Sequence, residues 1–351
     1  MHAGAWHQLL IARPVEPPAP LTAAKLDRLD QRARDGYAGA VTDWFAQEWF
    51  ASDLVDGVIA GATARIEANR RSPIGAKEIV AVHGPYGVGK TSTILRLSRT
   101  LYPHYVQGEE FPTWSPDVGI VHDLVPVMWV QLQAGSTLKT LYGSLLDFLR
   151  FPVHGTGNVL ASRALSSLAR FGVQVLILDD VHKLRESQQA SRDIIDALHT
   201  INTSLGELGG TLCLVGSEMG QRALLNHPQI DSRLKTMHLP PFTVGQHTDK
   251  VLWQKFLRGV EDLCGPYLPG NEPGFLALEL PAYIHARTQG FMQDVQQLLK
   301  DGMRVALAEP IPALSRAILD RILLSERAQR AHTLIRSQPR GRVRAERLAA
   351  S

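Results

Sequence analysis

The residues with the clearest chemical potential lie in the stretch HGPYGVGKTS, residues 83–92. Gly84, four further residues, and then Gly89, Lys90 and Thr91 fit the Walker A pattern, a glycine-rich loop between a strand and a helix. Backbone N–H groups of such a loop close around phosphate oxygens, the lysine adds positive charge, and the threonine hydroxyl can ligate magnesium. The sequence therefore predicts binding of ATP with Mg²⁺ by Gly84, Pro85, Tyr86, Gly87, Val88, Gly89, Lys90, Thr91 and Ser92.

A metal ion at this loop needs a second, acidic anchor, and the run VQVLILDD, residues 173–180, supplies one. Asp179 lies at the carboxyl end of an apolar run, which is where ligands bind in open parallel sheets. An unpaired carboxylate is costly to bury there, which argues against a role in the core alone. We predict that Asp179 and Thr91 hold the metal. Asp180 follows directly.

Two further polar residues are candidates for the reaction itself. Ser217 ends the run GTLCLVGS and would lie beside the metal-binding strand, where it can orient water or contact the outer phosphate; an ordinary serine at a strand end is the alternative. Arg233 follows a turn-forming segment and precedes LPPF. Its guanidinium could stabilise charge on the phosphoryl group held by a neighbouring subunit, and a solvated surface arginine is the alternative.

The elements that position these residues follow from the apolar periodicity. Short apolar runs at 78–84, 125–132, 173–180 and 210–217 predict strands, and helical spacing at 91–100, 137–150, 159–170 and 191–205 predicts helices between them. This alternation is typical of an α/β fold, in which helices cover both faces of a parallel sheet in three layers. After residue 242 only helical patterns occur.

We therefore predict five segments. Residues 1–20 are an irregular arm rich in Pro and Ala, 21–75 a helical lead-in, 76–242 the nucleotide-binding core, and 243–328 an all-helical lid; 329–351 form a disordered, arginine-rich tail. Within the lead-in, the stretch DWFAQEWF places four aromatic residues on neighbouring turns of a helix. Such a cluster is more typical of a buried face than of a binding surface.

Composition narrows the class of protein. The chain has 351 residues and 44% hydrophobic residues, enough to bury a large core, while a net charge of +3 permits contact with DNA without requiring it. Its two cysteines, Cys213 and Cys264, are far apart and predict neither a disulfide framework nor a zinc site. No run of about eighteen apolar residues occurs, so we expect a cytoplasmic protein that does not enter the membrane.

Between about Gly36 and Leu324 the chain resembles AAA+ ATPases, and more narrowly the TniB family, the ATPase partners of DDE transposases. The resemblance rests on the ordered motifs GPYGVGKTS, VLILDDVHKL, LVGSE, HPQIDSRL, LPPF and ARTQGFMQDVQQLL. It implies an AAA+ core with a helical lid. It also implies an ATP-dependent homo-oligomer that assembles on double-stranded DNA and helps a transposase to engage its target.

Three positions depart from the family pattern. Asp180 occupies the place of a glutamate that polarises the attacking water, Lys183 replaces a common asparagine, and TQGFMQDV lacks the arginine of a second sensor. We therefore expect slow, assembly-dependent hydrolysis, a switch more than a motor. A signalling or defence ATPase that binds a protein partner without DNA remains the alternative, and a P-loop phosphotransferase is a weaker third.

Overall fold

The computed structural model describes residues 1–117, 119–184, 188–217 and 228–337 of the chain. These residues form two compact units, each made of two segments of the chain. The first unit contains Met1–Arg13 and the described residues of Leu54–Pro240, and the second contains Pro14–Asp53 and the described residues from Pro241 onward. All of the predicted site residues belong to the first unit.

A five-stranded sheet forms the centre of the first unit, with the strand order β4-β5-β6-β1-β7. Every neighbouring pair is parallel, so the carboxyl ends of all five strands lie at the same edge. The three inner strands are apolar and almost fully buried, as expected for a sheet that is covered on both faces. The strands are β1 (Ile79–His83), β4 (Val127–Gln131), β5 (Val175–Asp179), β6 (Thr211–Gly216) and β7 (Leu234–His238).

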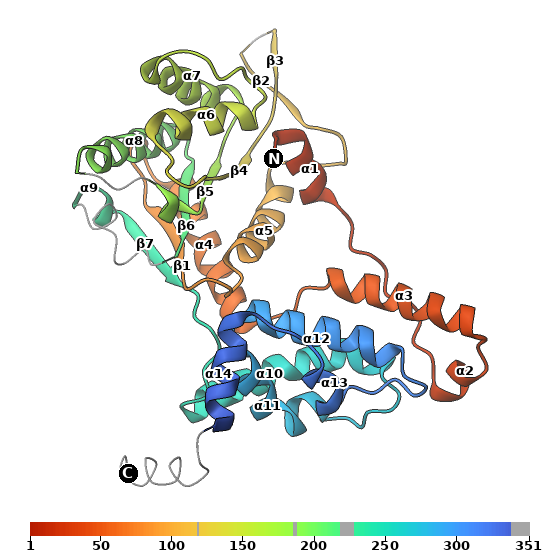
Figure 1. The fold of residues 1–351 in the computed structure, drawn as a ribbon. Helices are drawn as coiled ribbons and strands as arrows, with labels where there is room; N and C mark the ends of the chain where they lie inside the picture. Colours follow the sequence, from red (N-terminus) through yellow and green to blue (C-terminus); the bar gives the residue numbers. More distant parts are fainter. Residues whose placement is uncertain (118, 185–187, 218–227, 338–351) are drawn as a thin grey trace. The chain divides into compact units, whose positions relative to one another are not determined.

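Helices cover both faces of this sheet (Figure 1). From β1 the chain crosses to the edge strand β4, and it then passes back through β5 and β6 in the opposite direction along the sheet. Because crossover connections are right-handed, the helix of the outward connection and the helices of the return connections lie on opposite faces. One face carries α4 (Asp53–Arg71) and α5 (Lys90–Leu101), and the other carries α6 (Leu138–Phe148), α7 (Gly157–Arg170) and α8 (Gln188–Glu207). Short elements complete the unit: η1 (Tyr102–His104), η2 (Val181–Lys183) and α9 (Pro228–Asp231).

The α/β core was predicted correctly, but three strands were missed. β7 is an edge strand in which every residue is half-buried or exposed, and it has no continuous apolar run. The other two, β2 (Thr113–Asp117) and β3 (Ile120–Asp123), form a separate antiparallel pair between η1 and β4. Apolar residues of this pair are exposed, including Val121 at 67% exposure. The pair therefore lacks the buried apolar run by which the other strands were predicted.

The predicted irregular arm is wrong for nearly half of its length, because Ala3–Ile11 form the helix α1. The His2 side chain accepts a hydrogen bond from the backbone N–H of Ala5 and caps this helix. Trp6 and Leu10, four residues apart, are buried on the same side of α1. Tertiary contacts thus stabilise a helix that is too short to be stable alone.

The second unit is helical and combines the lid with part of the predicted lead-in. α3 (Gln31–Gln47) packs against α12 (Met292–Leu307), and Trp44 contacts Tyr267 with 5.0 Å between ring centroids. The lead-in is therefore not one segment, because α4 belongs to the first unit. The remaining helices are α2 (Ala23–Asp27), α10 (His247–Cys264), η4 (Gly265–Tyr267), the π-helix η5 (Phe275–Glu279), α11 (Pro281–Thr288), α13 (Arg316–Asp320) and α14 (Glu326–Ser337).

The predicted disordered tail begins too early, since α14 continues to Ser337. The rest of the arginine-rich tail lies outside the described residues. No described helix is both long enough and apolar enough to cross a membrane.

Candidate nucleotide-binding site

The phosphate loop, residues 84–89, connects the end of β1 to the first turn of α5. Gly87 and Gly89 have φ angles of 85° and 93°, in the left-handed region that favours glycine. Gly84 is required for a different reason, because a Cβ atom there would lie 2.1 Å from the carbonyl oxygen of Leu239. The loop therefore brings backbone N–H groups to the amino end of a twelve-residue helix, where helix geometry favours anions.

The residues of the loop that were predicted to contact the nucleotide differ in which of their groups are accessible to a ligand. Tyr86 is 63% exposed, whereas the side chain of Val88 is buried, so only the backbone of Val88 can contact a ligand. Pro85 contributes a carbonyl oxygen but has no N–H group. Thr91 and Ser92 lie in the first turn of α5 with exposed side chains.

Lys90 points back over the loop. Its Nζ atom donates to the carbonyl oxygens of Gly84 and Pro85, at 2.9 Å and 2.8 Å. Burial lowers the pKa of Lys90, although the nearby carboxylates of Asp179 and Asp180 oppose this shift. The ammonium group thus lies where phosphate oxygens could replace the carbonyl partners.

Thr91 and Asp179 meet across the sheet edge. The Thr91 hydroxyl donates to Oδ2 of Asp179 at 3.0 Å, and the backbone N–H of Asp180 donates to Oδ1 at 2.8 Å. Asp179 is 1% exposed, and burial raises its pKa, while the hydrogen bonds from Thr91, Asp180 and Trp129 and the nearby Asp180 charge act as smaller influences. A hydroxyl and a carboxylate are hard oxygen ligands of the kind that magnesium prefers.

Asp180 faces a different environment. Its backbone is in the left-handed region, with φ at 60°, which turns the chain from β5 into η2. Oδ2 of Asp180 accepts hydrogen bonds from Lys183 Nζ at 2.7 Å and from Gln131 Nε2 at 3.0 Å. Burial raises the pKa of Asp180, but these bonds and the positive charge of Lys183 outweigh it, so the pKa is lowered.

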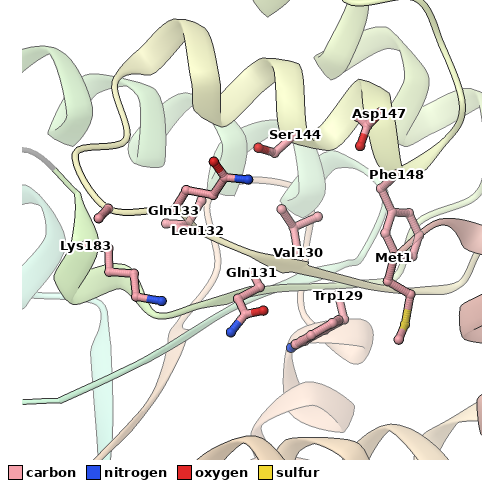
Figure 2. Close-up of a pocket in the computed structure, with 11 residues that line it drawn as sticks. Met1, Trp129, Val130, Gln131, Leu132, Gln133, Ser144, Asp147, Phe148 and Lys183 are labelled. Atoms are coloured by element: carbon pink, nitrogen blue, oxygen red, sulfur yellow. The ribbon is translucent and has the colours of Figure 1, made fainter.

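A cavity of about 440 Å³ lies beside β4, and Gln131 and Lys183 both line it (Figure 2). Trp129, Asp147 and Phe148 are among the other lining residues. The two side chains that restrain Asp180 are therefore accessible from a solvent-facing cavity.

Ser217 follows β6 and is buried next to η2. Its backbone N–H donates to Nδ1 of His182 at 3.3 Å, and His182 packs edge-to-face against Tyr86 with 5.3 Å between ring centroids. Within the described residues, the Ser217 hydroxyl is one of five buried side-chain polar atoms that have no hydrogen-bond partner. Such an atom near a phosphate loop suits a polar ligand or an ordered water.

Arg233 does not join this group. It precedes β7, and its backbone carbonyl accepts from Ile79 N–H at the amino end of β1. Nη1 of Arg233 donates to the carbonyl oxygen of Ala76 at 2.8 Å. Five residues of β1 separate this end from the phosphate loop, or about 16 Å at about 3.3 Å per residue.

The geometry fits ATP with magnesium. Lys90 is held by replaceable carbonyl oxygens, Thr91 and Asp179 form an oxygen pair, and the Ser217 hydroxyl lacks a partner. Within the described parts of the chain, no group of three or more His, Cys, Asp or Glu side chains could hold a metal alone. Magnesium would therefore need phosphate oxygens as further ligands.

Sequence reasoning missed two neighbours of the site, Gln131 and His182. Both lie near the carboxyl ends of strands, Gln131 as the last residue of β4 and His182 two residues after Asp180. In a parallel sheet these ends share one edge, so Gln131, a polar residue next to the end of the VPVMWVQL run, was a usable signal.

The chain is similar in fold to solved structures of known proteins. The crystal structure of Cdc6p from Pyrobaculum aerophilum superimposes with a TM-score of 0.53 at 15% identity, over 84% of this chain and 73% of that one. Domain III of the replication initiation protein DnaA from Thermotoga maritima matches with a TM-score of 0.41 at 12% identity, over 82% of this chain and 94% of that one. The fold is an AAA+ fold, with a five-stranded parallel sheet and a helical region after it.

Two comparisons of sequence give different results. No curated protein matches the chain. The family model described as bacterial TniB protein matches residues 61–244, which are 184 of the 351 residues and include every predicted site residue. The chain therefore belongs to the TniB family.

Proposed function

We propose that the protein is an ATP-dependent switch that forms homo-oligomers on double-stranded DNA and helps a DDE transposase to select or engage its target. Slow ATP hydrolysis would end the assembled state. The DNA and transposase parts of this proposal derive from the TniB family. The switching part is supported by the contacts around the nucleotide site.

The observation that carries the proposal is the position of Arg233. An arginine side chain spans about half of the 16 Å between the two ends of β1, so Arg233 cannot reach phosphates held by its own phosphate loop. If Arg233 stabilises a transferring phosphoryl group, it must do so in another subunit. Hydrolysis would then depend on assembly.

The state of Asp180 supports slow hydrolysis. A general base needs a free carboxylate oxygen toward its water, whereas Oδ2 of Asp180 already accepts from Lys183 and Gln131. The short Asp side chain and these two bonds restrain the group that would polarise water. ATP could therefore persist long enough to maintain an assembly.

The first experiment measures binding of a labelled DNA duplex together with the size of the complexes. The protein is tested without nucleotide, with ADP, and with a slowly hydrolysed ATP analogue, at low and moderate salt. We expect large DNA-bound assemblies only with the analogue, and weaker binding at higher salt because phosphate contacts release counterions.

A negative result would be equally informative. If the protein binds nucleotide but no DNA in any state, the proposal is wrong, and a signalling ATPase with a protein partner becomes the better hypothesis. If assemblies form equally with ADP and with the analogue, ATP is not the switch.

Replacing Arg233 tests the assembly-dependent site. Arg233→Ala should leave nucleotide affinity unchanged but lower the hydrolysis rate by about 10³-fold under assembling conditions, the lower end of the effect of an arginine supplied in trans. Arg163→Ala is a matched control, since Arg163 also donates to a main-chain carbonyl, that of His154, at 3.3 Å. A wild-type rate in assembled Arg233→Ala would exclude the role in trans.

A further inference from the structure

The amino-terminal helix α1 covers part of the free edge of the nucleotide-binding sheet. The indole N–H of Trp6 donates to the carbonyl oxygen of Val127 in the edge strand β4, at 3.0 Å. The Trp6 ring also stacks on Trp129, with 5.4 Å between ring centroids and 17° between the planes. Trp6 is only 3% exposed, so this contact is part of the fold of the first unit.

Other contacts fix α1 against its surroundings. His7 bonds the Tyr102 hydroxyl at 2.7 Å and the carbonyl oxygen of Glu109 at 3.1 Å. Arg99, from α5, donates to the carbonyl oxygen of Leu9 at 2.9 Å. Because α1 is held by α5 and by the segment that follows it, the Trp6 ring is a fixed support for Trp129.

Trp129 and Asp179 lie on the same face of the sheet. In the parallel register Trp129 pairs with Ile177 and Gln131 pairs with Asp179, and residues two apart on a strand share a face. The nitrogen of the Trp129 ring is turned toward Gln131, at the carboxyl end of the strand (Figure 2). The only polar atom of the ring is this N–H group, and a hydrogen bond from Trp129 is among the smaller influences that lower the pKa of Asp179 against the effect of burial.

We propose that Trp129, supported by Trp6, is a positioning residue that orients the metal-binding carboxylate of Asp179. Three groups face this carboxylate, and one of them, the Thr91 hydroxyl, would also ligate magnesium. The other two, which cannot bind metal, are the backbone N–H of Asp180 and the indole N–H of Trp129. Such outer partners fix the direction of a metal ligand, and their loss weakens metal binding.

This inference deepens the proposed function and requires only the part of it that concerns ATP with magnesium. It assigns a role to α1. The helix would support the metal site through the Trp6 ring, which stacks on Trp129 about 120 residues further along the chain. DNA binding and assembly are not needed for the test.

The test measures how the affinity of the full chain for a ribose-labelled ATP, followed by anisotropy, depends on Mg²⁺. Trp129→Phe keeps an aromatic ring for Trp6 but removes the N–H donor. We expect it to need about tenfold more Mg²⁺ for half of the affinity gain, as for other outer partners of metal ligands. Its affinity in EDTA should equal that of the wild type, because the phosphate loop is unchanged.

Trp114→Phe is the matched control. Trp114 also lies in the first unit, and its indole N–H donates to a main-chain oxygen, that of Arg170, at 3.0 Å. The substitution thus removes the same atoms and an indole hydrogen bond, but one to a main-chain carbonyl that precedes β5 instead of to Asp179. We expect a normal Mg²⁺ requirement, whatever its effect on the melting temperature.

Two changes at Trp6 test the support from α1. Trp6→Ala removes the stacked ring and should raise the Mg²⁺ requirement in the same direction as Trp129→Phe, by a smaller factor. Trp6→Phe keeps an aromatic ring, so its Mg²⁺ requirement should stay close to that of the wild type. A general loss of structure would instead lower the affinity in EDTA for both variants.

The outcomes separate this inference from the proposed function. If the wild type binds ATP with a clear Mg²⁺ dependence and Trp129→Phe is unchanged, or shifts no more than Trp114→Phe, the positioning role is wrong and the proposed function stands. If the wild type binds no ATP with or without Mg²⁺, the proposed function fails and this role fails with it.

Discussion

Two groups of residues meet at the carboxyl end of β5, and their hydrogen-bond partners differ; we call them the metal side and the water side after the roles proposed for them. The metal side contains Lys90, Thr91 and Asp179, whose polar groups are paired with partners that a nucleotide and its metal could replace or share. The water side contains Asp180, whose carboxylate is tied to Lys183 and Gln131. Adjacent residues thus differ sharply: the pKa of Asp179 is raised by burial, and that of Asp180 is lowered by its donors.

This difference supports the proposal that the site is prepared for nucleotide binding and that hydrolysis is slow. On the metal side, groups are held close to the geometry that the ligand needs, which reduces the cost of binding. On the water side, we propose that the bonds from Lys183 and Gln131 to Oδ2 hold the Asp180 carboxylate and slow its action as a base. The following predictions test each side, beginning with the largest effect.

Lys90→Ala should remove nucleotide binding. Loss of a buried, hydrogen-bonded charge at a binding site costs about 2–5 kcal/mol, or about 30-fold or more in affinity. Titration of labelled ATP into the purified variant measures it.

Lys77→Ala is the control for Lys90→Ala. Lys77 is another buried lysine whose Nζ donates to backbone carbonyls, those of Ser72 and Pro73, but it precedes β1 and lies at the other end of the sheet. An equal loss of ATP affinity in folded Lys77→Ala would mean that Lys90 acts through stability alone.

Asp180→Asn and Lys183→Ala should change hydrolysis in opposite directions. The amide cannot accept a proton, so Asp180→Asn should slow hydrolysis by about 100-fold with little change in ATP affinity. Lys183→Ala should speed it several-fold, because it frees Oδ2 of Asp180. Steady-state phosphate release at saturating ATP measures both.

The control for Lys183→Ala is Lys235→Ala. Lys235 pairs with Glu78 at 3.3 Å, beside the amino end of β1 and away from Asp180. If Lys183→Ala hydrolyses ATP no faster than Lys235→Ala, Lys183 does not restrain the water side.

The same two aspartates should also differ in their effect on stability. Burial opposes the charge of Asp179 and raises its pKa, so Asp179→Asn should raise the melting temperature of the ligand-free protein by about 2–4 °C. Asp180 gains from its donors, so Asp180→Asn should lower it. Differential scanning calorimetry without Mg²⁺ or nucleotide measures both melting temperatures. If the two substitutions shift the melting temperature in the same direction, the two aspartates do not differ in this way.

The smallest effect concerns pH and His83, which ends β1 directly before the phosphate loop. Burial, the neighbouring His238, with 4.9 Å between the rings, and Lys90 lower the pKa of His83 below 6.5. The unfolded chain therefore takes up the proton first, and stability that is complete above pH 6.5 falls as the pH drops toward the folded value.

We expect His83→Gln to make this acid loss of stability shallower. Urea denaturation between about pH 7 and about pH 5 gives the free energy of unfolding at each pH. His154→Gln, at an exposed position before α7, is the control and should keep the wild-type slope. If the free energy of unfolding falls equally with pH in the wild type and in both variants, His83 does not cause the acid loss of stability.

Much of the site was predictable because its chemistry is local in the chain. Three glycines, a lysine and a threonine within eight residues require one loop, and an apolar run that ends in aspartate requires one strand end. The helices of the core were predicted to within a few residues, since their apolar spacing records which face is buried. These features are set by neighbours in sequence.

The tertiary structure decided what depends on residues far apart. Neither the bonds of Lys183 and Gln131 to Asp180 nor the stack of Trp6 on Trp129 follows from spacing, because burial and hydrogen bonding depend on which strands become neighbours. The edge strand β7 and the helix α1 were missed for the same reason, since each is stabilised by what it packs against. The sequence by itself determined a loop and a strand end suited to phosphate and metal, and only the fold determined that the adjacent aspartate is restrained.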